Sequence, residues 1–268
     1  MIFGTLMKKK NIQNRLVAFI DILGFSQRVK NISTTKDLKD LYNDVDHVQR
    51  EFEVVVKDKS EKEYRKMAGK DVLAFSDCLV ISLGAETKWT DSEGSFETFL
   101  VEFEQIGLAQ MHCIQKGIFI RGGIDIGWWY HDSHKVISSA LATSYELEGK
   151  ADVPVIALCK KIHDYLNGHP NKEAYKHDFD PLELLRKYHD KNMEFWFIDY
   201  LSICLRAQDF YEDREFVFEV HKKQIEKAYS KANTTKIKKK YRWLSKYHNE
   251  ILAEHGSGFA KHKIVLKS

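Results

Sequence analysis

Apolar residues along the first 160 positions recur with two different periods, and these periods predict a regular exchange of strands and helices. Short, nearly continuous apolar runs bounded by polar residues are typical of strands in a buried sheet. Apolar residues spaced by threes and fours are typical of helices that cover such a sheet. We expect strands at 15–21, at 71–82 (two strands joined by a turn at Ser76–Asp77), at 118–130 and at 153–158, and helices at 33–52, 95–117 and 138–149.

The order of these elements indicates the fold class. A strand, helical sequence, a strand pair, a helix and a further strand follow one another, which is the split βαβ or ferredoxin-like order. The expected fold is therefore α+β, with a ferredoxin-like βααββαβ core. Within the third extended segment, the pair Gly122–Gly123 indicates either a bulge or a close approach of another backbone.

The last hundred residues have a different pattern. A polar, loop-like stretch at 167–181 precedes "MEFWFIDYLSICL" (193–205), which reads as a strand or a buried segment. Two long helical patterns follow and predict an antiparallel helical pair at 206–232 and 236–255. We therefore divide the chain into an N-terminal extension (1–14), a core domain (15–165) and a mostly helical C-terminal extension packed on the core (166–268).

The composition, 43% hydrophobic and 30% charged, is that of a soluble globular protein. The longest apolar run, at 153–159, is far shorter than the roughly 20 residues that cross a bilayer as a helix, so no membrane partner is expected. The first ten residues place basic after apolar residues, the reverse of a secretory signal, and either Met1 or Met7 can be the start. Four scattered cysteines without paired spacing fit a reducing cytoplasm.

The formal net charge of +3 gives no strong footprint for a polyanion over the whole molecule. The segment "KIKKKYRWLSK" (236–246) is the exception, because it is basic and carries two aromatic residues. Ile237, Tyr241 and Leu244 recur there at helical spacing, which leaves the lysines on a solvated face. A nucleic-acid partner is therefore not expected.

One carboxylate breaks the apolar pattern. Asp21 follows the run 16–20 and precedes Ile22, at the end of the first predicted strand. Asp77 occupies the tip of the predicted hairpin, which can neighbour that strand in a ferredoxin-like sheet. Two carboxylates close together repel each other unless a cation lies between them, and Mg²⁺ takes such oxygen ligands. Each aspartate could instead serve only as a cap or a turn residue.

Two further features point to phosphate. Helical sequence begins after Asp21, so backbone N–H groups near Gly24 and Phe25 could receive phosphate oxygens. Arg121 in "FIRGGID" offers a fork-shaped cation on an adjacent strand, although it could simply pair with Asp125 or another acid of the sheet. Carboxylates, phosphate-binding amides and an arginine together indicate phosphoryl chemistry.

Four segments carry a resemblance to a known family. The chain resembles the class III nucleotide cyclase core over roughly residues 15–160, and specifically the bacterial pyrimidine cyclases of the Pycsar anti-phage systems. The tail phrases "FWFIDYLS" and "KKYRWLSKYHNEI" also resemble the C-terminal part of that group. The segments that carry the resemblance are "FIDILGFS", "FSDCLVIS", "RGGIDIG" and "VISSALATSYELEGKADVPVIAL".

The resemblance implies a role for each site residue. Asp21 and Asp77 would hold two divalent metal ions, Mn²⁺ or Mg²⁺, with the Ile22 carbonyl as an extra ligand. Arg121 would bind the triphosphate. The active species would be a homodimer with its sites at the interface, because class III enzymes build each site from two chains.

The base pocket departs from the family pattern. The two positions that read a purine in class III enzymes fall on Leu73 and Lys135, which favours a non-purine base, and Tyr42 could narrow such a pocket. The Asn and Arg that normally stabilise the transition state fall on Ala142 and Glu146.

The leading hypothesis is a pyrimidine nucleotide cyclase that makes cyclic CMP from CTP or cyclic UMP from UTP, as a cytoplasmic second messenger in anti-phage defence. A separate effector protein would sense the product. The alternatives are an adenylate or guanylate cyclase, and a degenerate cyclase homologue that binds nucleotide without turnover.

Overall fold

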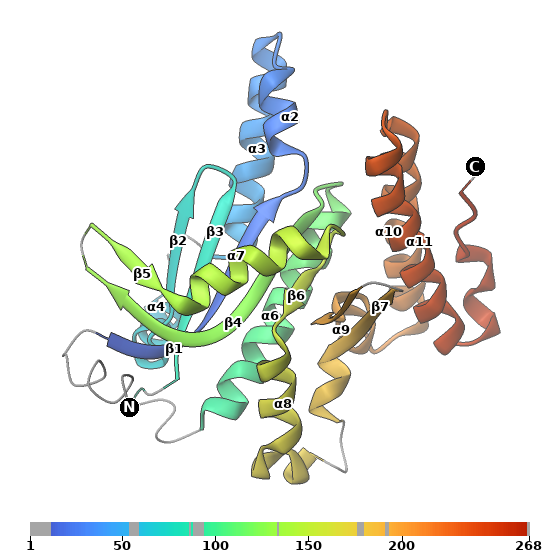
Figure 1. Ribbon diagram of the computed structural model, residues 1–268. Coiled ribbons are helices and arrows are strands. Elements are labelled where there is room, and N and C mark those ends of the chain that lie inside the picture. The colour runs from blue at the N-terminus through green and yellow to red at the C-terminus, as the bar shows by residue number, and fades with distance from the viewer. Residues whose placement is uncertain are drawn as a thin grey trace.

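The computed structural model describes residues 12–53, 59–85, 87, 94–132, 134–175, 180–190 and 193–266. The question of Met1 or Met7 as the start therefore lies outside the described residues, as do residues 176–179 of the predicted loop. A single mixed sheet forms the centre of the described part, with helices on both of its faces (Figure 1).

The sheet runs in the order β2-β3-β1-β4-β6-β8-β7, with β5 paired to β4. Strands β1, β2, β3 and β4 pair antiparallel in the order expected of a ferredoxin-like core, so the predicted α+β fold is confirmed. The strands are β1 (Ile12–Ile22), β2 (Asp71–Phe75), β3 (Cys78–Gly84), β4 (Ile120–His131), β5 (Val136–Ser138), β6 (Ile156–Leu158), β7 (Leu185–Asp190) and β8 (Met193–Ile198).

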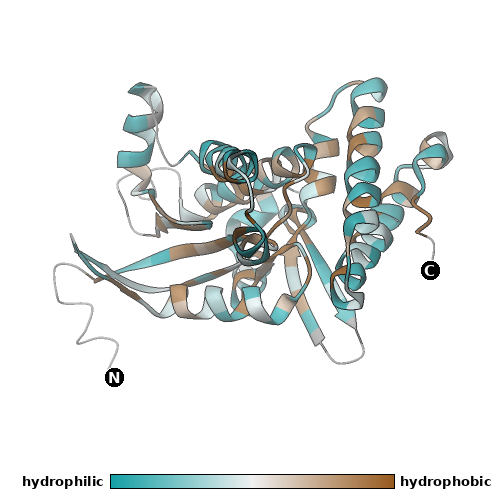
Figure 2. Cartoon of the chain, turned by 90° about the horizontal axis from the view of Figure 1, so that it is seen from above, coloured by the Kyte–Doolittle hydropathy of each residue, from teal (hydrophilic) through white to brown (hydrophobic). Residues whose placement is uncertain are grey.

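Helices separate the two faces of the sheet. In Figure 1, α7 crosses the front of the sheet, while α3 and α6 lie behind it, and the view from above in Figure 2 shows the same division. The helices are α2 (Phe25–Lys30), α3 (Thr35–Glu51), α4 (Lys59–Ala68), α6 (Ser95–Gln115), α7 (Ser139–Ala151), α8 (Lys160–Gly168), α9 (Tyr200–Arg206), α10 (Tyr211–Lys231) and α11 (Thr235–Glu254), with short 3-10 turns at Pro170–Tyr175, Pro181–Leu184 and Ser257–His262.

Local sequence explains the ends of the main helices. Thr34 caps α3 in a capping box, accepting from the Asp37 N–H while the Asp37 carboxylate accepts from the Thr34 N–H. Ser138 caps α7 by accepting a hydrogen bond from Leu141 N–H at 3.1 Å. Gly117, predicted as the stop of the helix at 95–117, has a positive φ of 79° just after α6.

The glycine pair of β4 marks a close backbone approach. Gly122 and Gly123 pair regularly with Ile20 and Phe19 of β1, so the strand has no bulge there. A Cβ on Gly123 would lie 2.1 Å from the main-chain oxygen of Ser144 on α7. Helix α7 can therefore lie directly on β4 only because that position has no side chain.

The C-terminal part adds strands to the sheet as well as helices. The segment 193–205 divides into β8 and α9 at Asp199, which caps α9. Strand β7 has no strong apolar alternation and was not expected from the sequence; it pairs with β8 at the sheet edge, where one side is exposed. Helix α4 was not expected either.

The predicted antiparallel helical pair is present as α10 and α11. A buried chain of hydrogen bonds joins it: Tyr200 Oη lies 2.9 Å from His221 Nε2, and His221 Nδ1 lies 2.9 Å from His248 Nδ1. His248 Nε2 then lies 3.0 Å from the His262 carbonyl oxygen. Because each of these buried polar groups has a hydrogen-bond partner, the histidines can link α10 and α11 without contact with water.

Within the part of the chain that the structure describes, no helix combines the length and the apolar character needed to cross a membrane.

Candidate active site

Two strand ends bring the predicted carboxylates together. Asp21 is the penultimate residue of β1, and Asp77 lies in the turn between β2 and β3. Strand β3 pairs antiparallel with β1, with Leu79 opposite Ile20, so the turn lies beside Asp21. The oxygen atoms of both aspartates and the Cys78 sulfur lie within 4.8 Å of one another.

The two carboxylates interact strongly. The pKa of Asp77 is raised to about 6, chiefly by burial, with contributions from a hydrogen bond with Asp21 and from the repulsion between the two groups. A carboxyl pair that resists full ionisation is what a divalent cation would stabilise. The geometry therefore supports the prediction that these side chains converge.

The Cys78 thiol is the third member of this cluster, and the sequence pattern did not single it out. Burial and the neighbouring negative charge of Asp21 raise the pKa of the thiol to about 12. Its sulfur lies 3.8 Å from Asp21 Oδ1, as a donor to that oxygen. A protonated thiol is a poor ligand, so the donor set of this cluster is two carboxylates, which suits a hard cation.

Arg121 lies directly opposite Asp21 in the β1–β4 register. Its Nη2 and Nε lie 3.0 and 3.3 Å from Asp21 Oδ2. The alternative partner is occupied elsewhere, because Asp125 accepts from Lys161 Nζ at 2.8 Å and from Cys159 Sγ at 2.6 Å. Arg121 thus belongs to the same cluster as the aspartates.

Glu148 of α7 is a site residue that the sequence analysis missed. Its carboxylate contacts Arg121 Nε and is buried, and burial raises its pKa against the opposing effect of the guanidinium. Glu148 continues the buried stripe of α7 formed by Ala140 and Ser144. A charge on the apolar stripe of a helix is the same signal that singled out Asp21 in its strand.

The predicted phosphate turn follows β1 directly. Gly24 has a φ of 81° and precedes α2, and a Cβ at this position would meet nothing within 4 Å. The space in front of the turn is therefore open on this chain. The Ile22 side chain is buried in the core, and Phe25 begins α2.

The residues predicted for a base pocket are spread over the chain. Tyr42 is exposed on α3, and Lys135 is exposed in the turn between β4 and β5. Leu73 packs against the small cluster of Val17, Trp129 and Ala140. Within the described part of one chain, no hydrogen bond, ion pair or ring contact joins Tyr42, Leu73 and Lys135, so the pocket stays a prediction.

The two positions aligned with a transition-state Asn and Arg lie on the outer face of α7. Ala142 is exposed, and Glu146 is exposed with its carboxylate 3.5 Å from Lys150 Nζ. Neither side chain can supply a positive charge or an amide to a phosphate.

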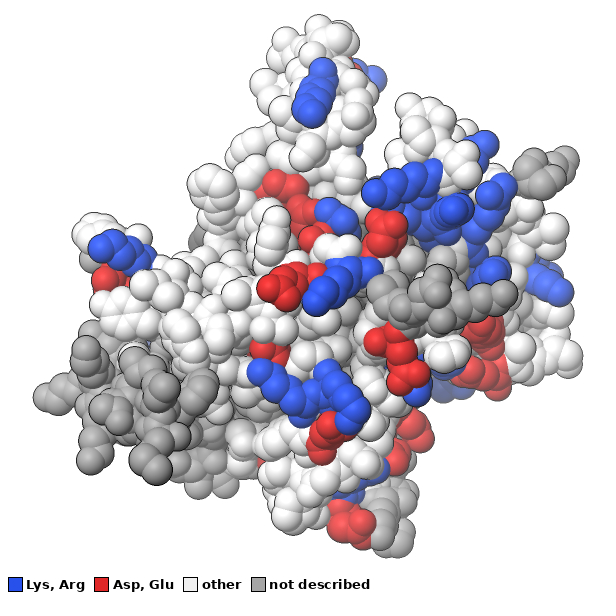
Figure 3. Space-filling model, in the orientation of Figure 1, with Lys and Arg blue, Asp and Glu red and all other residues white. Residues whose placement is uncertain are grey.

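Charges gather unevenly around this site. Figure 3 shows Lys and Arg side chains clustered over the upper ends of α10 and α11, beside acidic side chains near the middle of the same face. The basic segment 236–246 belongs to α11. Its Lys240 is buried, with Nζ 2.7 Å from the carbonyl oxygen of Asp152.

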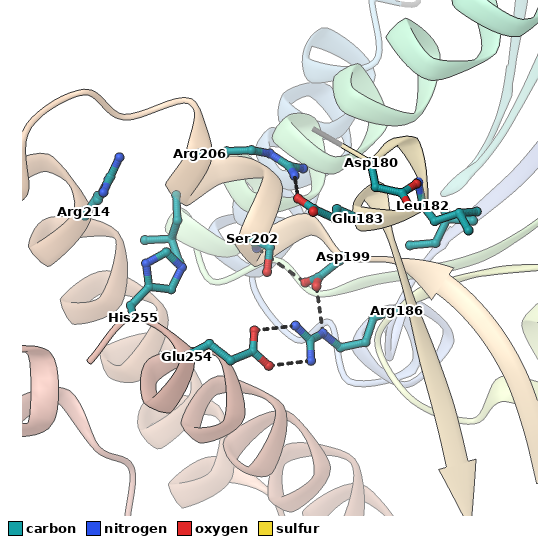
Figure 4. A pocket seen from close by; sticks show the side chains of 12 residues that line it. Asp180, Leu182, Glu183, Arg186, Asp199, Ser202, Arg206, Arg214, Glu254 and His255 are labelled. Atoms are coloured by element: carbon teal, nitrogen blue, oxygen red, sulfur yellow. Dashed lines mark hydrogen bonds and ion pairs between the residues drawn. The ribbon is translucent and has the colours of Figure 1, made fainter. Parts of the chain in front are cut away.

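A separate cavity of about 560 Å³ lies in the C-terminal part (Figure 4). Arg186 projects into it and bridges two acids: its Nε lies 2.7 Å from Asp199, and its two terminal nitrogens lie 2.9 and 2.8 Å from Glu254. These ion pairs connect β7, α9 and α11. Arg186, Asp199 and Glu254 thus form a structural junction at this cavity.

The comparisons with known proteins find loose structural likeness. No protein-family model matches the sequence, and no curated protein matches it. The adenylyl cyclase CyaB of Pseudomonas aeruginosa aligns with a TM-score of 0.45 at 11% identity, over 70% of this chain and 94% of that one.

Two further solved structures show the same degree of likeness. A bacterial light-regulated adenylyl cyclase aligns with a TM-score of 0.37 at 14% identity, over 80% of this chain and 57% of that one. A class III adenylyl cyclase-like ATP-binding protein of Pseudomonas aeruginosa aligns with a TM-score of 0.40 at 17% identity, over 57% of this chain and 34% of its own. At these values, the function of the site has to be argued from its own residues.

Proposed function

We propose that the protein is a pyrimidine nucleotide cyclase, which converts CTP or UTP to the 3′,5′-cyclic monophosphate and pyrophosphate. The observation that carries the proposal is the convergence of Asp21 and Asp77 beside Arg121. Two carboxylates and one arginine next to an open turn are the groups that hold a nucleoside triphosphate and its cations.

The reaction exchanges one bond for another. The ribose 3′-oxygen bonds to the α-phosphorus, the bond from that phosphorus to the bridging oxygen of the β-phosphate breaks, and the 3′-hydroxyl proton passes to solvent. The role of the protein is to position the triphosphate and to neutralise the charge that develops on the leaving pyrophosphate. We assign to Arg121 the binding of the triphosphate, in the bound substrate as well as in the transition state, and further contacts to the phosphates to the backbone N–H groups at Gly24 and Phe25.

The metal ligands of the proposal are Asp21, Asp77 and the Ile22 carbonyl. Two divalent cations, Mn²⁺ or Mg²⁺, when bound there would lower the pKa of the 3′-hydroxyl and offset the charge of the triphosphate. The donor chemistry fits, since both side chains offer oxygen atoms within 4.8 Å of each other.

The choice of a pyrimidine rests on the resemblance and on the absent purine readers. Leu73 and Lys135 stand where a class III enzyme reads a purine, and Leu73 is apolar and partly packed. The same resemblance supports a cytoplasmic role in anti-phage defence, with a separate effector protein that responds to the cyclic product. An adenylate or guanylate cyclase is the alternative if the base is read by other residues.

A homodimer is part of the proposal. Large apolar side chains are exposed on elements that carry the site: Phe75 on β2 is 84% exposed, Tyr145 on α7 61% and Ile137 on β5 52%. We assign these side chains to an interface, because large exposed apolar side chains are typical of a surface that a partner covers. A second copy of the chain would cover them and complete each base pocket.

A panel of the four nucleoside triphosphates tests the proposal. Purified protein with Mn²⁺ is incubated with each one, and cyclic product and pyrophosphate are measured. We expect turnover of CTP or UTP, and a loss of at least about 100-fold with Asp77→Ala, while Asp164→Ala, an exposed carboxylate on α8, keeps the wild-type rate.

Absence of cyclic product from both pyrimidine nucleotides would contradict the proposal, and turnover of ATP or GTP alone would establish the purine alternative. Retained turnover in Asp77→Ala would show that the metal assignment is wrong.

One observation favours a second candidate, a protein that binds nucleotide without converting it. Ala142 and Glu146 leave the outer face of α7 without a group to neutralise charge on the α-phosphate. This candidate predicts that CTP or UTP binds with Mn²⁺, measurable by calorimetry, and that no pyrophosphate is released.

A further inference from the structure

The C-terminal helical pair meets the core at the end of α7, next to the candidate active site. We propose that Lys240 of α11 is a positioning residue for that site: it fixes the C-terminal end of α7, so that Glu148 can hold Arg121 in place for the triphosphate. This inference rests on the proposed function, and it assigns a role to a part of the chain outside the core.

Lys240 joins α11 to the C-terminal end of α7 through a buried ion pair. The lysine side chain is only 8% exposed, and its Nζ donates to both the carbonyl oxygen and the carboxylate of Asp152. Asp152 ends α7 with a φ of 48°. The last carbonyl groups of a helix have no partner within the helix and carry partial negative charge, so a buried cation stabilises this end.

Glu148 lies one helical turn before Asp152 on the same helix. Its buried carboxylate contacts Arg121 Nε, and Arg121 Nη2 lies 3.0 Å from Asp21 Oδ2. The positive charge of Lys240 also favours the ionised form of Glu148. The charges thus alternate in sign from the end of α7, through Lys240 of α11, to the carboxylate cluster, in the order Asp152, Lys240, Glu148, Arg121 and Asp21.

Arg121 has two carboxylate partners, and in the proposed function only one of them stays bound to it. Asp21 would bind a cation, so that Glu148 would remain as the partner of the guanidinium. The orientation of Arg121 towards the phosphates then depends on where α7 places Glu148.

Helix α7 is held at three points along its length. Ser138 caps its start, and Ser144 donates to the Val17 carbonyl oxygen at 2.9 Å where the helix crosses Gly123. These two fixtures belong to the core. The third, Lys240, comes from α11 and binds the helix at Asp152, one turn after Glu148. Loss of the lysine would therefore free the end of the helix that orients Arg121 and leave the other end in place.

The test uses the full chain and compares Lys240→Met with Lys246→Met, which removes the same charge from an exposed position of α11. With the nucleotide that the wild type converts, we expect Lys240→Met to raise KM about 10-fold and to change kcat less than about twofold. The Mn²⁺ activation constant stays unchanged, because Asp21 and Asp77 are intact. Lys240→Arg restores most of the affinity, and Lys246→Met matches the wild type.

A merely structural role predicts a different split of the kinetic constants. If Lys240→Met only lowers the amount of folded enzyme, kcat falls and KM stays the same, and that result overturns the proposal. An equal effect of Lys246→Met also overturns it. Should Lys240→Met fail to fold, Asp152→Asn tests the same contact from the other side, with a smaller rise in KM expected.

Failure of the proposed function is distinguishable from failure of this inference. If the wild type converts none of the four triphosphates, binding of pyrophosphate in the presence of Mn²⁺ is measured by calorimetry instead. Lys240→Met is then expected to weaken pyrophosphate binding about 10-fold relative to Lys246→Met, and equal binding by the two variants overturns the role of Lys240.

Discussion

At the scale of single residues, the site consists of charges in places where charges are costly. Asp21 interrupts an apolar strand, and Glu148 interrupts the buried stripe of α7. Both side chains meet Arg121, so neither is left alone in the interior. Buried charges are tolerated when each has a partner. Asp77 differs from them, because the charged group that it faces is another carboxylate, Asp21.

The raised pKa of Asp77 predicts that the ionised carboxylate, which can bind a metal ion, destabilises the metal-free protein. Its carboxyl holds a proton more tightly in the folded protein than in the unfolded chain, so metal-free stability falls as pH rises through about 6. Asp77→Asn is therefore expected to raise the melting temperature of the metal-free protein at pH 7.5 by about 2 °C, since solvent screens this half-buried group. Thermal unfolding with and without Mn²⁺ measures both effects.

The same protonation competes with the cation. Stabilisation of the wild type by Mn²⁺ is expected to weaken as pH falls through about 6, and to be absent in Asp77→Asn. Asp164→Asn is the control, with wild-type behaviour in both measurements. If Asp77→Asn is stabilised by Mn²⁺ as much as the wild type, the ion does not bind at this carboxylate.

At the scale of elements, the position of α7 decides whether the site forms. The helix lies on β4 at Gly123, where a Cβ would come within 2.1 Å of the Ser144 oxygen. The sequence pattern predicted this helix and allowed a close approach at the glycine pair. It did not say which backbone comes close, since that depends on the connection that returns α7 over the sheet.

Substitution of Gly123 tests the packing of α7 against β4. Gly123→Ala forces α7 away from β4, and we expect a loss of about 1–3 kcal/mol in the free energy of unfolding. Gly149→Ala on the same helix is the matched control, because a Cβ there meets nothing within 4 Å. That variant is expected to gain about 0.5–1 kcal/mol, since alanine favours a helix. Chemical denaturation of both variants measures the difference, and unchanged stability of Gly123→Ala would contradict the packing described.

At the scale of the whole molecule, the sheet extends across both parts of the chain. Strands β8 and β7 continue the sheet beyond β6, and α11 contacts the end of α7 through Lys240. Phe75, Tyr145 and Ile137 are nevertheless exposed on β2, α7 and β5. A single chain leaves this apolar area in water, which is unfavourable unless a partner covers it.

The proposed homodimer predicts a change of mass in solution. Phe75→Glu places a charge where an apolar side chain would be buried, and we expect the dissociation constant of the dimer to rise at least about 100-fold. Phe216→Glu, at an exposed position on α10, is the control and stays dimeric. Sedimentation velocity gives the mass of each, and a wild type that is monomeric at micromolar concentration would contradict the proposal.

The sequence predicted the α+β class, the ferredoxin-like strand order and the convergence of the two aspartates, because periodicity and a charge in an apolar run are local signals. It also determined that Arg121 stands on the strand next to Asp21. It missed α4, α8 and β7. The patterns of α4 and β7 are weakly apolar because one side of each is exposed.

Which side chains share the site depends on tertiary packing. Glu148 lies 127 positions after Asp21, and Lys240 lies 92 positions after Glu148. The close approach of α7 to β4 and the return of α11 to the end of α7 bring these charges together. Such contacts depend on how distant elements pack, so no local pattern of residues contains them.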